Sequence, residues 1–178
     1  MATDPIRIAN CSGFFGDRLS AAKEMVEGGP IDALTGDWLA ELTMLILSRI
    51  QAKSPGGGYA RTFVTQMEQV MGQCLDKGIK VVTNAGGLNP EGCADAVQQV
   101  ADRLGLAPKV AYVGGDDLSK RLTELIGLGN QFNHLDTGEP LEKLADRIVT
   151  ANAYIGCWGI VEALNQGADI VVTGRATD

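Results

Sequence analysis

The sequence predicts an α/β protein in which a mostly parallel sheet is flanked by helices on both faces. Short apolar, β-branched runs alternate with longer segments of helical periodicity along the whole chain. Several of these runs end in a small polar residue and glycine. Glycine is abundant, with 23 of 178 residues, and most glycines fall where one element gives way to the next. Together these features are typical of a Rossmann-like fold.

The first half of the chain contains three expected strands and three expected helices. The strands are placed at 5–10, 31–34 and 81–83, and the helices at 18–27, 38–53 and 62–76. Apolar residues recur at helical spacing in the second helix at Leu39, Leu42, Ile46 and Ile50. In the third helix they recur at Phe63, Met67, Val70, Met71 and Cys74. These residues are expected to face the core.

The second half continues the alternation, with one irregular interval. A helix at 90–104 is expected to bury Val97, Val100, Ala101 and Leu104. A strand at 110–113 and a helix at 118–126 follow, and residues 127–140 form a long loop. A helical turn and then a strand at 148–154 are expected next. The chain closes with a helix at 158–166 and a strand at 169–173.

The loop after the central strand is a candidate anion site. Gly86 and Gly87 let the backbone turn sharply and approach a ligand, and Asn89 and Pro90 suit the start of a helix. The free N–H groups of that helix would point back at the loop. The alternative is an ordinary strand-to-helix turn with no ligand, since such turns recur throughout α/β folds.

Polar residues follow most of the expected strands, and the carboxyl ends of parallel strands share one edge of a sheet. Candidate acid–base residues are Asp37, Asp116 and Asp178. Candidate anion- or cofactor-binding residues are Asn84, Gly86, Gly87 and Arg175, and candidate substrate contacts are Asn10, Ser12 and Asn152. Each also has a structural alternative: Asp37 can cap the next helix, and Arg175 can pair with Asp169 or Asp178.

Several classes of function are disfavoured by composition. The net charge of −7 argues against binding to a nucleic-acid backbone. The four cysteines have no CxxC spacing and His134 is the single histidine, so neither a zinc site nor a Ser–His–Asp triad is expected. The GxGxxG dinucleotide fingerprint is missing, which leaves any cofactor unknown.

The same features set the expected location and extent of the protein. No secretory signal and no apolar run of membrane-spanning length is visible, so a reduced, cytoplasmic protein without membrane contact is expected. Residues 1–178 would form a single α/β domain. Because the chain stops just after a strand of central type, where a covering helix is due, we expect it to be a fragment of a longer protein.

Six ordered blocks of the sequence resemble the acyclic terpene utilisation (AtuA-like) family, long described as a domain of unknown function. The blocks are 7–18, 34–44, 81–92, 135–140, 151–159 and 169–178. They span essentially the whole chain, and family members are considerably longer, so the chain looks like the N-terminal part of such a protein.

The resemblance implies a role in the bacterial catabolism of branched acyclic terpenoids such as citronellol and geraniol, which proceeds through acyl-CoA thioesters. It implies no defined reaction and no set of catalytic residues. We therefore expect an enzyme, or an enzyme component, that takes a small anionic substrate such as an acyl-CoA. The alternative is a non-catalytic subunit that binds or senses acyl-CoA. Either would work as a homo-oligomer or with a partner enzyme.

Overall fold

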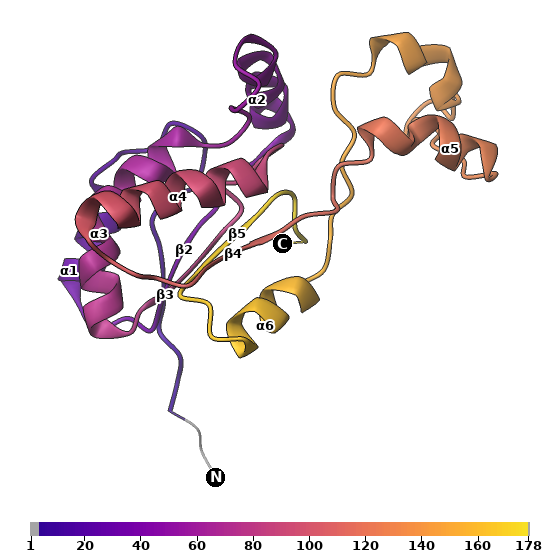
Figure 1. The fold of residues 1–178 in the computed structure, drawn as a ribbon. Coiled ribbons are helices and arrows are strands. Elements are labelled where there is room, and N and C mark those ends of the chain that lie inside the picture. The colour runs from indigo at the N-terminus through magenta and orange to yellow at the C-terminus, as the bar shows by residue number, and fades with distance from the viewer. Residues whose placement is uncertain (1–3, 178) are drawn as a thin grey trace.

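The core of the fold is a five-stranded parallel sheet with helices on both faces (Figure 1). The computed structural model describes residues 4–177, and residues 145 and 146 only in their backbone. The strands lie in the order β1-β2-β3-β5-β4, and every neighbouring pair is parallel. Their bounds are Ile8–Asn10 for β1, Ala33–Gly36 for β2, Lys80–Thr83 for β3, Val110–Val113 for β4 and Ile170–Thr173 for β5. The predicted α/β class is confirmed.

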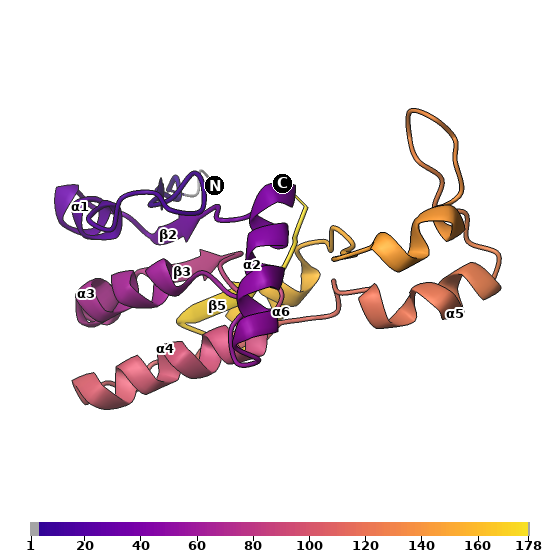
Figure 2. The same ribbon diagram turned by 90° about the horizontal axis from the view of Figure 1, so that it is seen from above.

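The helices form one full layer, one partial layer and one element at the end of the sheet. Helices α1 (Ala21–Gly28), α3 (Arg61–Lys77) and α4 (Pro90–Leu104) lie in a row on one face (Figure 2). Helix α6 (Trp158–Asn165) packs on the other face, against β4 and β5. Helix α2 (Glu41–Lys53) stands beyond the carboxyl ends of the strands.

The order of the strands places β5 at a reversal of the chain path. The chain steps from β1 to β2 to β3 in one direction, reaches β4 at the far edge, and returns to insert β5 between β3 and β4. Right-handed crossovers therefore put α4 and α6 on opposite faces. Ligands of parallel α/β sheets bind beyond the strand ends at such a reversal.

The main core lies between the sheet and the row of α1, α3 and α4. All five residues predicted to face inward from the third helix are buried: Phe63, Met67, Val70, Met71 and Cys74. They meet Leu34, Val81 and Val172 from the sheet. Each fully buried aliphatic or aromatic side chain stabilises such a core by about 1.5–3 kcal/mol. Helix α4 also buries Val97, Val100 and Ala101 as predicted, but Leu104, at its end, is 42% exposed.

The inward face predicted for α2 is confirmed only in part. Leu39 is buried and Ile50 packs against the core, but Leu42 is 67% exposed. The buried residues of the helix itself are Thr43, Met44 and Leu47. The reason is position: α2 stands at the end of the sheet and meets the loop around Gly87, so its environment differs from that of a helix lying on the sheet. The helix also begins later than predicted, after Ala40.

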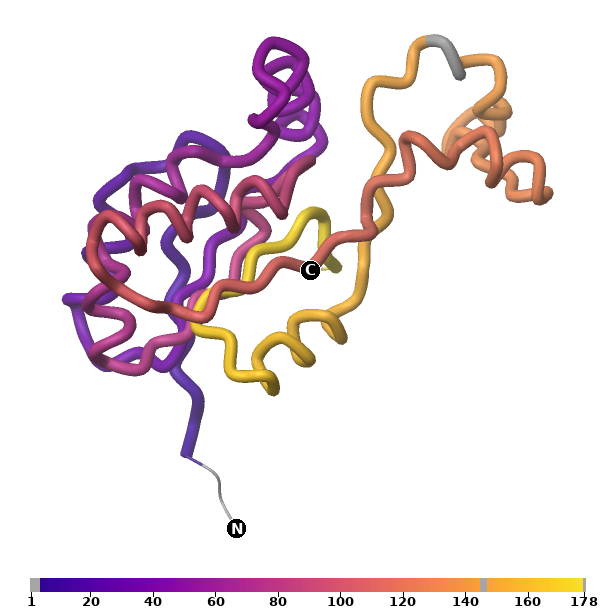
Figure 3. The backbone as a smooth tube through the Cα atoms, viewed as in Figure 1, coloured from indigo at the N-terminus to yellow at the C-terminus, as the bar shows by residue number. Residues whose placement is uncertain are grey.

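The strand predicted at 148–154 is absent from the described residues. A 3₁₀ helix, η2 (Leu141–Arg147), comes first, and the only pairing in the interval is an isolated antiparallel bridge between Asn152 and Asp117. Residues 118–151, which we term the arm, instead project away from the sheet (Figure 3). The arm contains η1 (Ser119–Arg121), α5 (Leu122–Gly127) and η2. Within the described side chains of residues 117–167, none is buried.

Candidate functional site

Two neighbouring cavities lie at the carboxyl edge of the sheet. The larger, which we term the central cleft, has a volume of about 330 Å³ and lies between the ends of β2, β3 and β5 and helix α6. Its polar lining combines hydroxyl, amide and carboxylate groups: Thr35, Asp37, Thr83, Asn84, Thr173 and Thr177. The smaller, the arginine pocket, has a volume of about 240 Å³. It is lined by Glu41, Met44, Thr150, Asn152, Tyr154 and Arg175.

Asp37 and Asn84 form a fixed pair in the central cleft. Nδ2 of Asn84 donates to Oδ1 of Asp37 at 2.7 Å, and the Leu39 amide donates to the same oxygen at 3.2 Å. Oδ1 of Asn84 accepts from the amide of Trp38 at 2.7 Å. Both hydrogen bonds to Asp37 therefore reach Oδ1, and among the described residues none reaches Oδ2. That oxygen remains available to a ligand in the cleft.

Asp116 holds the chain in place around Arg175. Its Oδ2 accepts from the backbone amide of Arg175 at 2.9 Å and from Nδ2 of Asn152 at 3.0 Å. Asp116 itself is 3% exposed. Gly174 makes this approach possible, because a Cβ at that position would lie 2.4 Å from Oδ2 of Asp116. Asp116 thus fixes both the end of β5 and the base of the arm.

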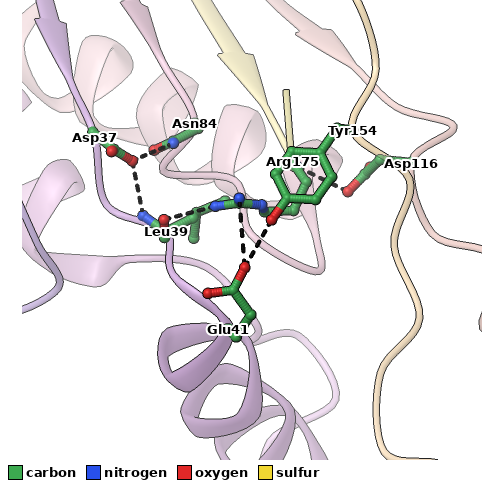
Figure 4. A network of polar contacts seen from close by, with 7 residues as sticks. All are labelled: Asp37, Leu39, Glu41, Asn84, Asp116, Tyr154 and Arg175. Atoms are coloured by element: carbon green, nitrogen blue, oxygen red, sulfur yellow. Dashed lines mark hydrogen bonds and ion pairs between the residues drawn. The ribbon is translucent and has the colours of Figure 1, made fainter. Parts of the chain in front are cut away.

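The guanidinium of Arg175 is buried but only partly neutralised (Figure 4). Its side chain is 9% exposed, and Nη1 donates to the Leu39 carbonyl oxygen at 2.7 Å. The Tyr154 ring stacks on it, with its centroid 4.3 Å from Cζ. Among the described residues, the one carboxylate within ion-pair range is Glu41, 4.0 Å from Nη2, which is too long for a hydrogen bond. A buried cation in this state attracts an anion into the pocket.

Glu41 closes the outer side of the arginine pocket. The hydroxyl of Tyr154 donates to its Oε1 at 2.7 Å across the pocket mouth. This hydrogen bond, with a bond from its own backbone amide and the charge of Arg175, lowers the pKa of Glu41. Its side chain is nevertheless 84% exposed, so the carboxylate sits at the surface.

A comparison with protein families decides where the chain belongs. The model of the acyclic terpene utilisation family protein AtuA matches residues 6–178. The chain belongs to this AtuA family. Family membership implies involvement in acyclic terpene utilisation. No curated protein and no solved structure gives a significant match to this AtuA-family chain.

In this AtuA-family chain the predicted site residues fall into separate groups. Asp37 and Asn84 lie together in the central cleft, and Asn152 and Arg175 line the arginine pocket above Asp116. Asn10 and Ser12 line a third cavity of about 220 Å³ at the end of β1. Their side chains bond locally, Ser12 to the Phe14 carbonyl and Asn10 to the Ser12 amide. Asp178 lies outside the described residues.

The glycine loop of the AtuA-family chain is packed rather than open. The amide of Gly86 donates to the carbonyl of Thr173, and that of Gly87 donates to the carbonyl of Asn84. Both glycines are buried, and a Cβ on Gly87 would lie 2.4 Å from Leu47 Cδ1. The amides of Gly86 and Gly87 are therefore already bonded to carbonyl oxygens within the protein, and they hold the sheet edge together.

Two structural alternatives raised by the sequence are also corrected. Arg175 does not pair with Asp169, which instead bonds Lys80 at 2.8 Å. Asp37 does not cap α2, whose N-cap is Ala40. Within the described residues no group of three or more His, Cys, Asp or Glu side chains is arranged to hold a metal ion. The described helices include none with the length and apolar character needed to cross a membrane.

Sequence reasoning missed Glu41 and Tyr154. They lie 113 positions apart, and neither follows a strand directly. The available signal was weak: an acidic residue near the start of an expected helix normally complements the helix dipole. Only the fold shows that both side chains meet at Arg175.

Proposed function

We propose that the protein binds a branched acyclic acyl-CoA, or the acid from which it is made, at the carboxyl edge of the sheet, and acts on it as an enzyme. Arg175 anchors an anionic group of this ligand. The observation that carries the proposal is the state of Arg175. Its side chain is 9% exposed and lines a pocket, and the nearest carboxylate among residues 4–177, that of Glu41, lies 4.0 Å away.

Arginine suits this role because its planar donors match the oxygens of a carboxylate or phosphate. The backbone amide of Arg175 bonds to Asp116, and its side chain bonds to the carbonyl of Leu39. These two hydrogen bonds fix the direction of the side chain before a ligand arrives. Such preorganisation reduces the entropy that binding must overcome. Arg175 also follows β5, the strand at the reversal of the sheet order, where ligands of this fold class bind.

Asp37 is the acid–base residue in this proposal. Its Oδ1 is held by Asn84 and Leu39, which leaves Oδ2 to exchange a proton with a ligand in the central cleft. Asp116 is a positioning residue, since it is buried and its Oδ2 already accepts two hydrogen bonds. The Asp37→Asn variant is expected to bind ligand and to lose turnover.

Isothermal titration with citronellyl-CoA and with citronellate, the acid from which it is made, tests the anchoring role. For whichever of the two ligands the wild type binds more tightly, the Arg175→Met variant should bind about tenfold or more weakly, as expected for loss of a charge-assisted pair. Arg175→Lys keeps the charge without the planar donors, so its affinity should lie between that of the wild type and that of Arg175→Met. Arg121→Met is the matched control, because Arg121 pairs with Glu124 on the arm. Absence of binding to the wild type, or equal binding by Arg175→Met, would count against the proposal.

A second candidate is a non-catalytic subunit that presents the bound acyl-CoA to a partner enzyme or to another copy of the chain. The arm favours this function, because it exposes Leu128, Leu135 and Val149 and buries none of its described side chains. Turnover of the acyl-CoA by the purified protein alone would support the enzyme. Binding without turnover, together with recovery of turnover on adding a partner, would support the subunit.

A further inference from the structure

The arginine pocket already contains a carboxylate, that of Glu41. It is held by the hydroxyl of Tyr154 at 2.7 Å and lies 4.0 Å from Nη2 of Arg175. It also stands in the first turn of α2, whose N-cap Ala40 provides no side-chain acceptor for the free amides. Three independent groups thus favour negative charge at one point. The groups that hold the Glu41 carboxylate at this point could equally hold the carboxylate of a ligand.

The Glu41 side chain can move out of the pocket at little energetic cost. Its side chain is 84% exposed, whereas that of Arg175 is 9% exposed. Moving Glu41 into water therefore costs little, and it releases the Tyr154 hydroxyl and the front of the guanidinium together. Among the described residues, the single hydrogen bond made by the guanidinium goes from Nη1 to Leu39. Since a guanidinium has five N–H donors, most of them remain for an incoming group.

The size and charge of the pocket limit what can enter. A volume of about 240 Å³ admits a small head group and the start of a chain. Met44 and the ring of Tyr154 form apolar walls, and Arg175 is the one cation among the described lining residues. One cation balances one negative charge. A phosphate dianion would bring a second charge close to Glu41 with nothing to neutralise it.

We propose that the arginine pocket binds a single carboxylate group carried on an apolar chain, and that this group displaces Glu41 from beside Arg175. The inference rests on the proposed function, because it names the chemical group that the same site receives. Glu41 is then a specificity-determining residue: it reserves the site for monoanions and competes with weak ligands. The Tyr154 hydroxyl donates to the Glu41 carboxylate when no ligand is bound, and to the ligand carboxylate when one is bound.

Titration with citronellate, a branched apolar monocarboxylate, tests this displacement. Removing the resident competitor in Glu41→Gln should tighten citronellate binding by about three- to tenfold, because the open form becomes the main form. Tyr154→Phe keeps the ring on Arg175 and removes the hydroxyl that holds Glu41. This variant releases Glu41, which favours ligand binding, but it also loses the hydrogen bond from the hydroxyl to the ligand. Its gain in citronellate affinity should therefore be smaller than that of Glu41→Gln. Glu68→Gln, which breaks the pair of Glu68 with Arg103 on the far helices, is the matched control.

Geranyl monophosphate is the second probe. Wild-type protein should bind it more weakly than citronellate, and Glu41→Gln should narrow that difference. Tighter binding of the phosphate to wild type, or unchanged citronellate affinity in Glu41→Gln, would overturn the inference. If citronellyl-CoA still binds and still depends on Arg175 in that case, the proposed function stands and only the carboxylate assignment fails. If none of the three probes binds, both fail.

Discussion

The backbone amide of Arg175 donates a 2.9 Å hydrogen bond to Oδ2 of Asp116, which lies 59 positions earlier in the chain. This contact joins the carboxyl ends of two neighbouring strands, β5 and β4. The same oxygen accepts from Asn152 at the base of the arm. One buried carboxylate therefore sets the position of Arg175, the proposed anion anchor, and of the segment that carries Tyr154.

Replacing Asp116 by alanine should destabilise the protein. Alanine has no side-chain oxygen, so the Arg175 amide and Nδ2 of Asn152 would both lose the acceptor that they share. We expect the free energy of unfolding to fall by about 1–3 kcal/mol in urea titrations. Asp136→Ala, at an exposed loop position, should stay within about 0.5 kcal/mol of wild type. Equal stability of the two variants would show that the Asp116 bonds contribute nothing net.

Adding a methyl group at Gly86 should also destabilise the protein. A Cβ there would lie 2.6 Å from the carbonyl oxygen of Thr173 and 2.7 Å from Cα of Pro90. Because both obstacles are backbone atoms, we expect Gly86→Ala to cost about 1–3 kcal/mol in thermal or urea unfolding. Gly114→Ala is the control, since a Cβ at Gly114 meets nothing within 4 Å. A near-neutral Gly86→Ala would indicate a loop that yields easily.

The pair between Arg7 and Asp32 should stabilise the protein near neutral pH and lose that contribution in acid. Hydrogen bonds from the side chain and backbone of Arg7 lower the pKa of Asp32 from 3.8 to about 2. The stabilising contribution is therefore fully present above the unfolded pKa of 3.8 and is lost as the pH falls towards 2. Asp32→Asn should show a shallower loss of unfolding free energy across this window than wild type. Parallel curves for the two proteins would contradict the assignment.

The four cysteines should differ sharply in reactivity. Burial raises the pKa of Cys11 and Cys74 to about 11 and that of Cys93 to about 12, which suppresses the reactive thiolate. Cys157 is exposed. A disulfide reagent such as DTNB should label one thiol rapidly in the native protein and four after denaturation. Cys157→Ser should remove the rapid phase and leave the slow one.

The sequence predicted the buried residues correctly where a helix lies along a single uniform surface. Helix α3 lies flat on the core, so its 3.6-residue periodicity identified all five of its buried apolar residues, although not the buried Gln66. Helix α2 stands at the end of the sheet, where the loop around Gly87 decides which side is covered, so its periodicity identified Leu39 and Ile50 but wrongly included Leu42. The interval 148–154 failed for a related reason: its backbone pairs once, at Asn152, and its Tyr154 serves the arginine pocket rather than a sheet.

The candidate site was predictable in part. Arg175, Asp37 and Asn84 follow strands directly, so the rule for parallel sheets placed them at the correct edge. The same rule also selected Gly86 and Gly87, because it cannot tell whether a loop amide faces a ligand or a neighbouring carbonyl. The partnership of Glu41 with Tyr154 depends on how the arm returns to the sheet, which no local pattern encodes.

The arm leaves and rejoins the body of the molecule beside one short bridge, between Asp117 and Asn152. Since none of its described side chains is buried, its length and composition are decoupled from the folding of the sheet. It is therefore a suitable position for a fluorescent reporter or an affinity tag. Leu135, which is 100% exposed, is the natural point of attachment for following the protein in its cellular setting without disturbing its core.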